Sequence, residues 1–334
     1  MKLETLPDLG LTPDLQTVWD ATPNLQEKHE ALRATTLGQY RQTMPEMQSF
    51  DPDTTIRFVD MHPDSADSAT AIVVPFPFAT GIVPHMVARM DMIQAASEKP
   101  LRLIALPNSA LGVQTISLTR QERGQIASGD FTPYTDRALR TLDHLGVTRA
   151  HVMGYSQGGA IGAHLLGRLP RTLDGLASGL FDPPNMARQP LAHLTRGFVA
   201  TGIRAVHRAM TAAQVPMILE SVRAESRRQS TADLLHYAHA ATTGINNALA
   251  RGMARHAIAD DLYAAADHGT PLTLMRGEKS TVTPAEPFYD VVERLVADYP
   301  DYIHHFEVPE VGHEVGDNIV IHGIMAVIAL RNGA

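Results

Sequence analysis

The chain has 334 residues, and 28 Lys and Arg against 36 Asp and Glu give it a formal net charge of −8 at pH 7. This acidic balance argues against a protein whose main task is to bind nucleic acid, and a hydrophobic fraction of 44% excludes wholesale disorder. The absence of cysteine excludes disulfides, Cys-ligated zinc, iron–sulfur clusters and thiol nucleophiles.

No stretch of the chain has the pattern of a leader or a membrane span. The N-terminal segment lacks the apolar core of a secretory signal. The most apolar stretch, residues 71–87, contains three prolines and is shorter than the roughly 20 residues that a spanning helix needs. We therefore expect a cytoplasmic protein with no membrane span and no nucleic-acid partner. The oligomeric state stays open, a homo-oligomer included.

The predicted elements begin with residues 1–53, which are polar and helix-compatible and predict an N-terminal helical extension. From residue 54 onwards, apolar β-branched runs alternate with stretches of helical length. This alternation is typical of a parallel sheet with crossover helices. Strands are expected at 54–64 (an edge strand), 71–78, 101–106, 149–156, 173–182, 271–277 and 302–308, and helices at 82–98, 133–146, 158–169 and 317–331.

Residues 186–268 have a different pattern, with Ala, Leu, Arg and His at helical spacing and no convincing strand. The predicted architecture is therefore an α/β core with a mostly parallel sheet flanked by helices. The core is formed by residues 54–185 and 269–334 and is interrupted by an all-helical insertion at 186–268.

The most informative local sequence is Gly-Tyr-Ser-Gln-Gly at 154–158, between a predicted strand and a predicted helix. A nucleophile on such a tight turn adopts strained dihedral angles, and small residues two positions before and after it avoid collisions. The turn would expose the hydroxyl of Ser156 above the sheet. It would also point the backbone N–H of Gln157 at a developing oxyanion.

A serine nucleophile needs a base, and His313 is the best candidate among the histidines. It follows a predicted strand and lies in a loop, just before the last predicted helix. His151 and His164 flank the Ser156 turn, and we interpret both as packing residues.

These features resemble the α/β-hydrolase superfamily over residues 54–185 and 270–331. The resemblance depends on GYSQGG at 154–159, GEKS at 277–280 and VGH at 311–313. It implies a catalytic triad in the chain order nucleophile, acid, histidine. It also implies that residues 186–268 form a helical cap after the sixth strand of the family, and that no cofactor or metal is needed.

The resemblance leaves the acid of the triad open. In the family it usually follows the seventh strand in a G-x-x-D pattern, but Ser280 occupies the aspartate position here. Some relatives place the acid after the sixth strand, and Asp182 lies there, so we favour it. Glu278 is the rival, because its longer side chain starts from a different point in the turn. Asp317, another group, or no acid at all complete the alternatives.

The second oxyanion donor is also open. Relatives often have a His-Gly pair after the third strand, and the next residue supplies a backbone N–H. The equivalent stretch here is Pro-Phe-Pro-Phe at 75–78, and proline has no N–H to donate. Only Phe76 and Phe78 are able to donate, and we favour Phe76.

The leading prediction is a serine hydrolase that cleaves a small-molecule ester or related acyl compound through an acyl-enzyme on Ser156. His313 would be the general base and a carboxylate would orient it. The departures at positions 75–78 and 280 favour an alternative, a non-catalytic or weakly active binding protein on the same fold. A third hypothesis is a lipolytic esterase acting on cell-envelope or long-chain esters, because cutinase-like enzymes share the GYSQG sequence. The lack of cysteine and the long insertion count against it.

Overall fold

The computed structural model describes residues 12–35, 45–46, 48–49, 56–77, 84–97, 99–107, 118–200 and 245–332. Some of the sequence predictions lie outside this part of the chain. They concern Phe78, the side chain of Asp317, the stretches 1–11 and 36–44 of the predicted N-terminal extension, and the stretch 201–244 of the predicted insertion.

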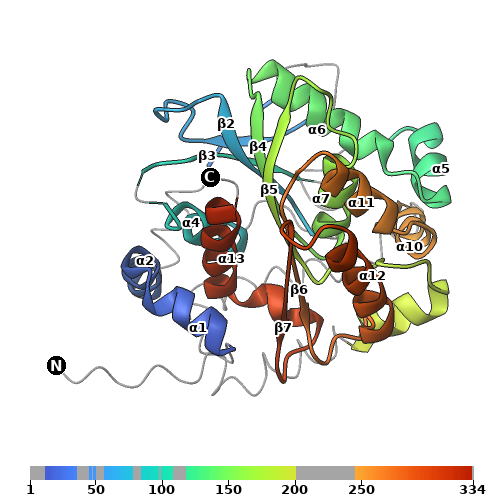
Figure 1. The fold of residues 1–334 in the computed structure, drawn as a ribbon. Helices are drawn as coiled ribbons and strands as arrows, with labels where there is room; N and C mark the ends of the chain where they lie inside the picture. The colour runs from blue at the N-terminus through green and yellow to red at the C-terminus, as the bar shows by residue number, and fades with distance from the viewer. Residues whose placement is uncertain are drawn as a thin grey trace.

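Within these ranges, seven strands form one sheet in the order β1-β3-β2-β4-β5-β6-β7. Neighbouring strands pair in parallel except β1 and β3, which pair antiparallel at one end of the sheet. The prediction of a mostly parallel sheet flanked by helices is therefore confirmed (Figure 1). The strands are β1 (Val59–Met61), β2 (Thr70–Pro75), β3 (Arg102–Leu106), β4 (Arg149–Tyr155), β5 (Asp174–Phe181), β6 (Leu272–Gly277) and β7 (Ile303–Val308).

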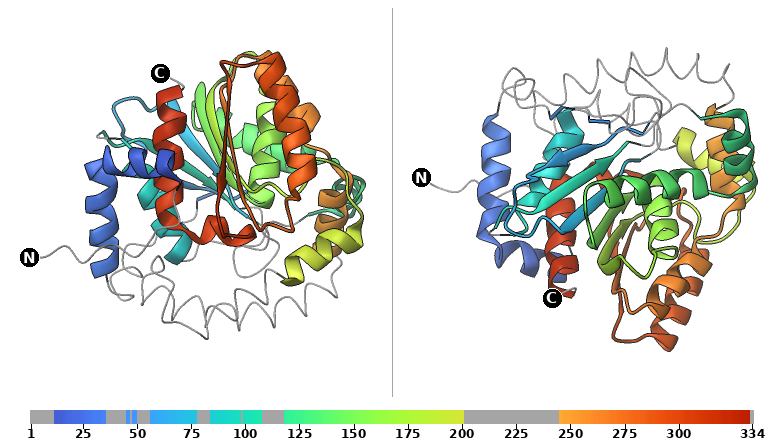
Figure 2. Two further views of the ribbon diagram at one scale, coloured as in Figure 1. Left: turned by 60° about the horizontal axis from the view of Figure 1, so that its bottom comes forward. Right: turned by 90° about the horizontal axis from the view of Figure 1, so that it is seen from above.

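Alternate residues of the strands enter two apolar clusters on opposite faces of the sheet, as the period of two in a strand requires. In β2, Ile72 and Val74 pack in the first cluster, and Ala71 and Val73 pack in the second. Figures 1 and 2 show one group of helices on each face. The first cluster includes α1 (Pro13–Asp20), α2 (Pro23–Ala34), α4 (Pro84–Gln94) and α13 (Ile319–Asn332), and the second includes α6 (Thr132–His144), α7 (Gln157–Leu166), α11 (Ala259–Asp267) and α12 (Ala285–Asp298).

A third apolar cluster joins further helices to α6 and α7. It includes Phe131, Ile161, Leu194, Met253 and Val282. The further helices are α5 (Arg120–Ser128), α10 (Ile245–Arg255) and the helical segment at 191–200. The described part of the predicted insertion is helical and contains no strand. The boundary between the insertion and the core stays a prediction. The helix α11 lies inside the range 186–268 predicted for the insertion, but it packs in the second cluster with α7 and β6.

None of the helices in the described ranges is long and apolar enough to cross a bilayer.

Candidate active site

The candidate site lies at the carboxyl ends of four adjacent parallel strands. Ser156 follows β4, Asp182 follows β5, Gly277 ends β6, and His313 lies beyond β7. The chain order of strands reverses around β2, which has β3 on one side and β4 on the other. Crevices at such reversal points, outside the carboxyl ends of the strands, are where open α/β sheets bind ligands.

Ser156 occupies a strained turn between β4 and α7. Its φ of 55° lies in the left-handed region that residues with a side chain rarely adopt. Glycine is required at both flanking positions, because a Cβ atom there would collide with the backbone of a neighbouring segment. A Cβ on Gly154 would lie 2.4 Å from the carbonyl oxygen of Gly158, and a Cβ on Gly158 would lie 2.2 Å from that of Pro75. The absence of both side chains lets α7 begin directly after the serine.

His313 begins η1 (His313–Asp317), a single 3-10 turn after β7. Its Nε2 atom lies 2.8 Å from the Oγ atom of Ser156. Tyr155 supports the loop, because its hydroxyl donates to the carbonyl of His313 at 2.6 Å. The centroid of its ring lies 5.3 Å from the centroid of the imidazole. The ring of Phe198, from the helical segment 191–200, meets the imidazole edge-on at 5.6 Å. These contacts leave His313 only 4% exposed.

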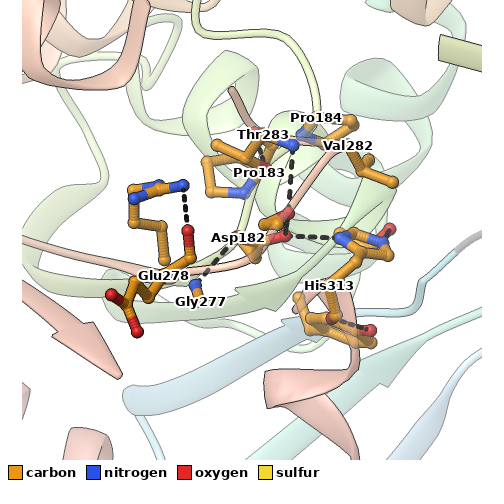
Figure 3. A network of polar contacts seen from close by, with 12 residues as sticks. Asp182, Pro183, Pro184, Gly277, Glu278, Val282, Thr283 and His313 are labelled. Carbon is orange, nitrogen blue, oxygen red and sulfur yellow. Dashed lines mark hydrogen bonds and ion pairs between the residues drawn. The ribbon is translucent and has the colours of Figure 1, made fainter. Parts of the chain in front are cut away.

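Asp182 completes a continuous chain of contacts to the serine. Its Oδ2 atom lies 2.5 Å from Nδ1 of His313 and also accepts the hydroxyl of Ser280 at 2.6 Å. Its Oδ1 atom accepts the N–H of Gly277 at 3.1 Å (Figure 3). The carboxylate is fully buried, so its donors come from the protein. A carboxylate acceptor at Nδ1 keeps the ring proton there and turns the lone pair of Nε2 towards Ser156.

The structure thus brings together Ser156, His313 and Asp182, and it does not place Glu278 with them. Glu278 is exposed, and its carboxylate accepts the backbone N–H of Glu310 at 2.7 Å. Figure 3 shows this carboxylate pointing away from His313. The contacts of Tyr155 were not predicted, and Ser280 was interpreted only as a missing aspartate. The sole signal for Ser280 was a polar residue at the family's acid position.

The candidate oxyanion donors differ in what they contact. Gln157 is the first residue of α7, so its backbone N–H belongs to the unpaired first turn of a helix. The N–H of Phe76 donates to the carbonyl of Leu106 at 3.1 Å and is therefore engaged beside β3. Phe78, the other candidate, lies outside the described residues. Of the two candidates within the described residues, Gln157 is the one whose N–H lies in the unpaired first turn of a helix.

The two histidines beside the Ser156 turn are buried packing residues. His151 lies on β4 and His164 on α7. Burial lowers the pKa of each imidazole to about 4. The ring of His164 stacks at 5.2 Å on that of His256. Both imidazoles are therefore neutral near pH 7. The ring partner of His164 is His256, which is not a residue of the Ser156 turn.

An apolar hollow of about 380 Å³, part of it open to solvent, lies between the ends of β2 and β3 and the helices α6 and α7. Pro75 and Leu106 line it from the ends of β2 and β3, and Ile161 lines it from α7. In the described ranges, no three side chains of His, Asp or Glu gather in a way that would hold a metal ion.

No protein-family model matches the chain, and no curated protein matches it by sequence. Solved structures do match it. The serine hydrolase CCSP0084 from Cycloclasticus zankles is 12% identical, covers 85% of this chain and 97% of its own, and has a TM-score of 0.56. For a proline iminopeptidase from Mycobacterium smegmatis the values are 18%, 86%, 98% and 0.54. For a membrane phospholipase A described as a bacterial virulence factor they are 16%, 90%, 93% and 0.58.

The chain has the α/β-hydrolase fold. This fold hosts many chemistries, and the residues of the site determine which one a given chain performs. In this fold Ser156, Asp182 and His313 follow β4, β5 and β7, in the chain order nucleophile, acid, histidine that the sequence resemblance implied.

Proposed function

We propose that this protein is a serine hydrolase that cleaves an ester or related acyl compound through an acyl-enzyme on Ser156. One observation supports this most strongly, namely the buried chain of contacts from Asp182 through His313 to Ser156, at 2.5 Å and 2.8 Å. A nucleophile, a base in hydrogen-bond reach and a group that orients the base are the parts that acyl transfer needs.

In the proposed first step, Oγ of Ser156 attacks the acyl carbon while Nε2 of His313 takes the hydroxyl proton. The buried carboxylate of Asp182 stabilises the imidazolium that forms. The carbonyl oxygen becomes an oxyanion and accepts the N–H of Gln157 at the start of α7. When the intermediate collapses, the bond to the leaving group breaks and Nε2 returns the proton to that group.

In the second step, water attacks the acyl-enzyme. His313 takes a proton from the water, and the hydroxide oxygen bonds to the acyl carbon. Collapse of this second intermediate breaks the bond to Ser156 Oγ, which recovers its proton from Nε2. The products are a carboxylic acid and the alcohol, or other leaving group, of the substrate. The two proposed steps consume only the substrate and one water molecule.

The substrate is proposed only as a class, a small acyl compound. Two of the matching structures are a serine hydrolase and a membrane phospholipase A, and both names fit a test that extends from short to long acyl chains. A binding protein on this fold would have no need for an oriented Ser–His pair, so the geometry favours the enzyme.

The test is covalent labelling of the purified protein with a fluorophosphonate, read by intact mass. We expect one adduct on the wild type and none on Ser156→Ala, because only an activated serine displaces fluoride from this reagent at a useful rate. Ser178→Ala is the matched control, since Ser178 is a fully buried serine of β5. An unlabelled wild type with a normal thermal unfolding transition would favour the binding protein instead.

Labelling is followed by hydrolysis of p-nitrophenyl esters with acyl chains of increasing length. A preference for short chains supports a small-ester hydrolase. A preference for long chains, together with activity on phospholipid vesicles, supports the lipolytic alternative.

A further inference from the structure

The loop after β6 holds a second hydroxyl in the polar network. Ser280 is 6% exposed, and its Oγ atom lies 2.6 Å from Oδ2 of Asp182, the same oxygen that contacts His313. The acceptor side of this hydroxyl is also used, because the N–H of Thr283 donates to Oγ at 3.1 Å. The proton of Ser280 is therefore directed at the carboxylate.

The same loop is attached to the residue that follows Asp182. The hydroxyl of Thr283 donates to the carbonyl of Pro183 at 2.9 Å. Figure 3 shows Thr283 and Pro183 next to each other beside the carboxylate. The position of Ser280 relative to Asp182 is thus fixed from both sides of the contact.

We propose that Ser280 is a positioning residue for the reaction on Ser156, and that its hydroxyl holds the Asp182 carboxylate in place for His313. This inference rests on the proposed function. Ser280 acts through Asp182 and His313, and the proposal gives it no contact with substrate.

The physical reason is the number of independent donors on the carboxylate. Gly277 holds Oδ1 and Ser280 holds Oδ2, so two protein donors fix the plane of the carboxylate without help from the imidazole. His313 then meets an acceptor that is already in place, which is the preorganisation that catalytic groups need. Without Ser280, one oxygen would have His313 as its single donor among the described residues, and ring and carboxylate would orient only each other.

The test compares Ser280→Ala with Ser178→Ala, which removes the same atoms from a buried serine of β5. Within the described residues the hydroxyl of Ser178 has no hydrogen-bond partner. For hydrolysis of p-nitrophenyl acetate we expect Ser280→Ala to lower kcat about 10- to 100-fold, the loss typical of one hydrogen bond to a charged group. KM should change less than about threefold, because the lost interaction does not touch substrate. Ser178→Ala should keep both constants.

A second readout does not depend on activity. The proton between Nδ1 of His313 and Asp182 should give a strongly downfield proton NMR resonance in the wild type and in Ser178→Ala. In Ser280→Ala this resonance should move or disappear. Ser280→Thr keeps the hydroxyl and should restore both the resonance and most of kcat. If the alanine variant is too unstable, Ser280→Cys replaces the strong donor by a weak one of similar size and should show the same losses in smaller measure.

The outcomes separate the two proposals. If fluorophosphonate labels the wild type at Ser156 but Ser280→Ala keeps its kcat and its resonance, the role of Ser280 is refuted and the hydrolase stands. The role of Ser280 is equally refuted if Ser178→Ala loses as much, or if only KM changes. If the wild type is not labelled, the hydrolase itself is refuted.

Discussion

Ser156 and Asp182 both have a backbone conformation that residues with side chains avoid, with φ of 55° and 43°. Such conformations cost about 1–3 kcal/mol each and persist only where neighbouring contacts hold them. Here the sheet supplies those contacts. The N–H of Ser156 donates to the carbonyl of Phe181 at 2.9 Å, and that of Asp182 donates to the carbonyl of Met275 at 2.6 Å. Both side chains are thereby fixed at the same edge, facing His313.

We predict that Asp182→Asn lowers kcat by roughly 10³- to 10⁴-fold, because the neutral amide no longer stabilises the imidazolium or fixes its tautomer. Steady-state hydrolysis of p-nitrophenyl acetate measures the loss. Glu278→Gln is the matched control, since the same charge is removed at the exposed residue that the sequence left as the rival. Equal losses in the two variants, or none in Asp182→Asn, would assign the acid elsewhere.

Gln157 presents a different problem, because its side chain is fully buried and neither amide atom has a hydrogen-bond partner within the described residues. A buried unpaired amide costs about 1–3 kcal/mol. Gln157→Met keeps the size and the backbone N–H but removes the polar atoms, so it should raise the free energy of unfolding by about 1 kcal/mol. Denaturation in urea measures this change, and fluorophosphonate labelling should persist. A less stable variant would mean that the amide is satisfied in solution.

At the scale of elements, strands were predictable where an apolar run was bounded by turn residues. The strand expected at 149–156 is β4 (Arg149–Tyr155), and the helix expected at 133–146 is α6 (Thr132–His144). Neither α5 nor α12 was predicted. The α5 helix has Ile126 as its buried residue and so lacks an apolar period. The α12 helix was missed although its buried residues Phe288, Val291, Val292 and Leu295 have helical spacing, and a proline in the first turn is compatible with a helix.

The acid was less predictable than the strands for a physical reason. Asp182 and His313 are 131 positions apart and meet because β5, β6 and β7 are neighbours in the sheet. Local patterns carry no information on that order, so only the resemblance suggested Asp182. The role of Ser280 depends on side-chain distances of the folded loop, which a single sequence does not contain.

The junction between β4 and α7 allows a test of close packing at the level of one element. Gly158→Ala would place a Cβ 2.2 Å from the backbone oxygen of Pro75, so that α7 or β2 would have to shift. We expect this variant to lose several kcal/mol of stability, at the upper end of single substitutions, or to displace α7 and abolish labelling of Ser156. Both effects are measured by urea denaturation and intact mass.

The control for this prediction is Gly124→Ala in α5, where an added Cβ would meet nothing within 4 Å. There the better helix propensity of alanine should stabilise the protein by about 0.5–1 kcal/mol. The prediction requires that Gly158→Ala lowers the free energy of unfolding and that Gly124→Ala raises it. A tolerated Gly158→Ala would mean that α7 does not approach β2 as closely as described.

At the scale of the whole molecule, a buried and a half-buried histidine connect helices that are distant in sequence. His164 on α7 stacks on His256, which follows α10, and the ring of Phe131 lies edge-on to both. His256 in turn contacts Asp261 on α11 at 2.7 Å. The described helices of the predicted insertion are therefore joined to the core partly through a neutral imidazole. Protonation of His164 would place a charge in this junction.

This arrangement predicts a loss of stability in weak acid. Burial lowers the pKa of His151 and of His164 to about 4 in the folded protein, against an ordinary 6.5. Between these values the unfolded chain binds more protons than the folded one, so stability is complete above about pH 6.5 and falls as the pH drops towards 4. Each histidine should lower the free energy of unfolding by about 2 kcal/mol at pH 5 relative to pH 7.5.

Urea denaturation of the wild type at pH 7.5 and pH 5 measures this difference. His164→Gln has no imidazole to protonate, so it should reduce the difference by about 2 kcal/mol, even if it is less stable than the wild type at both pH values. His305→Gln on β7 is the control, because that side chain is exposed and its removal should leave the difference unchanged. If His164→Gln kept the full acid sensitivity, the imidazole of His164 would have to be protonated or hydrated in the native state, and the junction between α7 and the segment after α10 would be open to water.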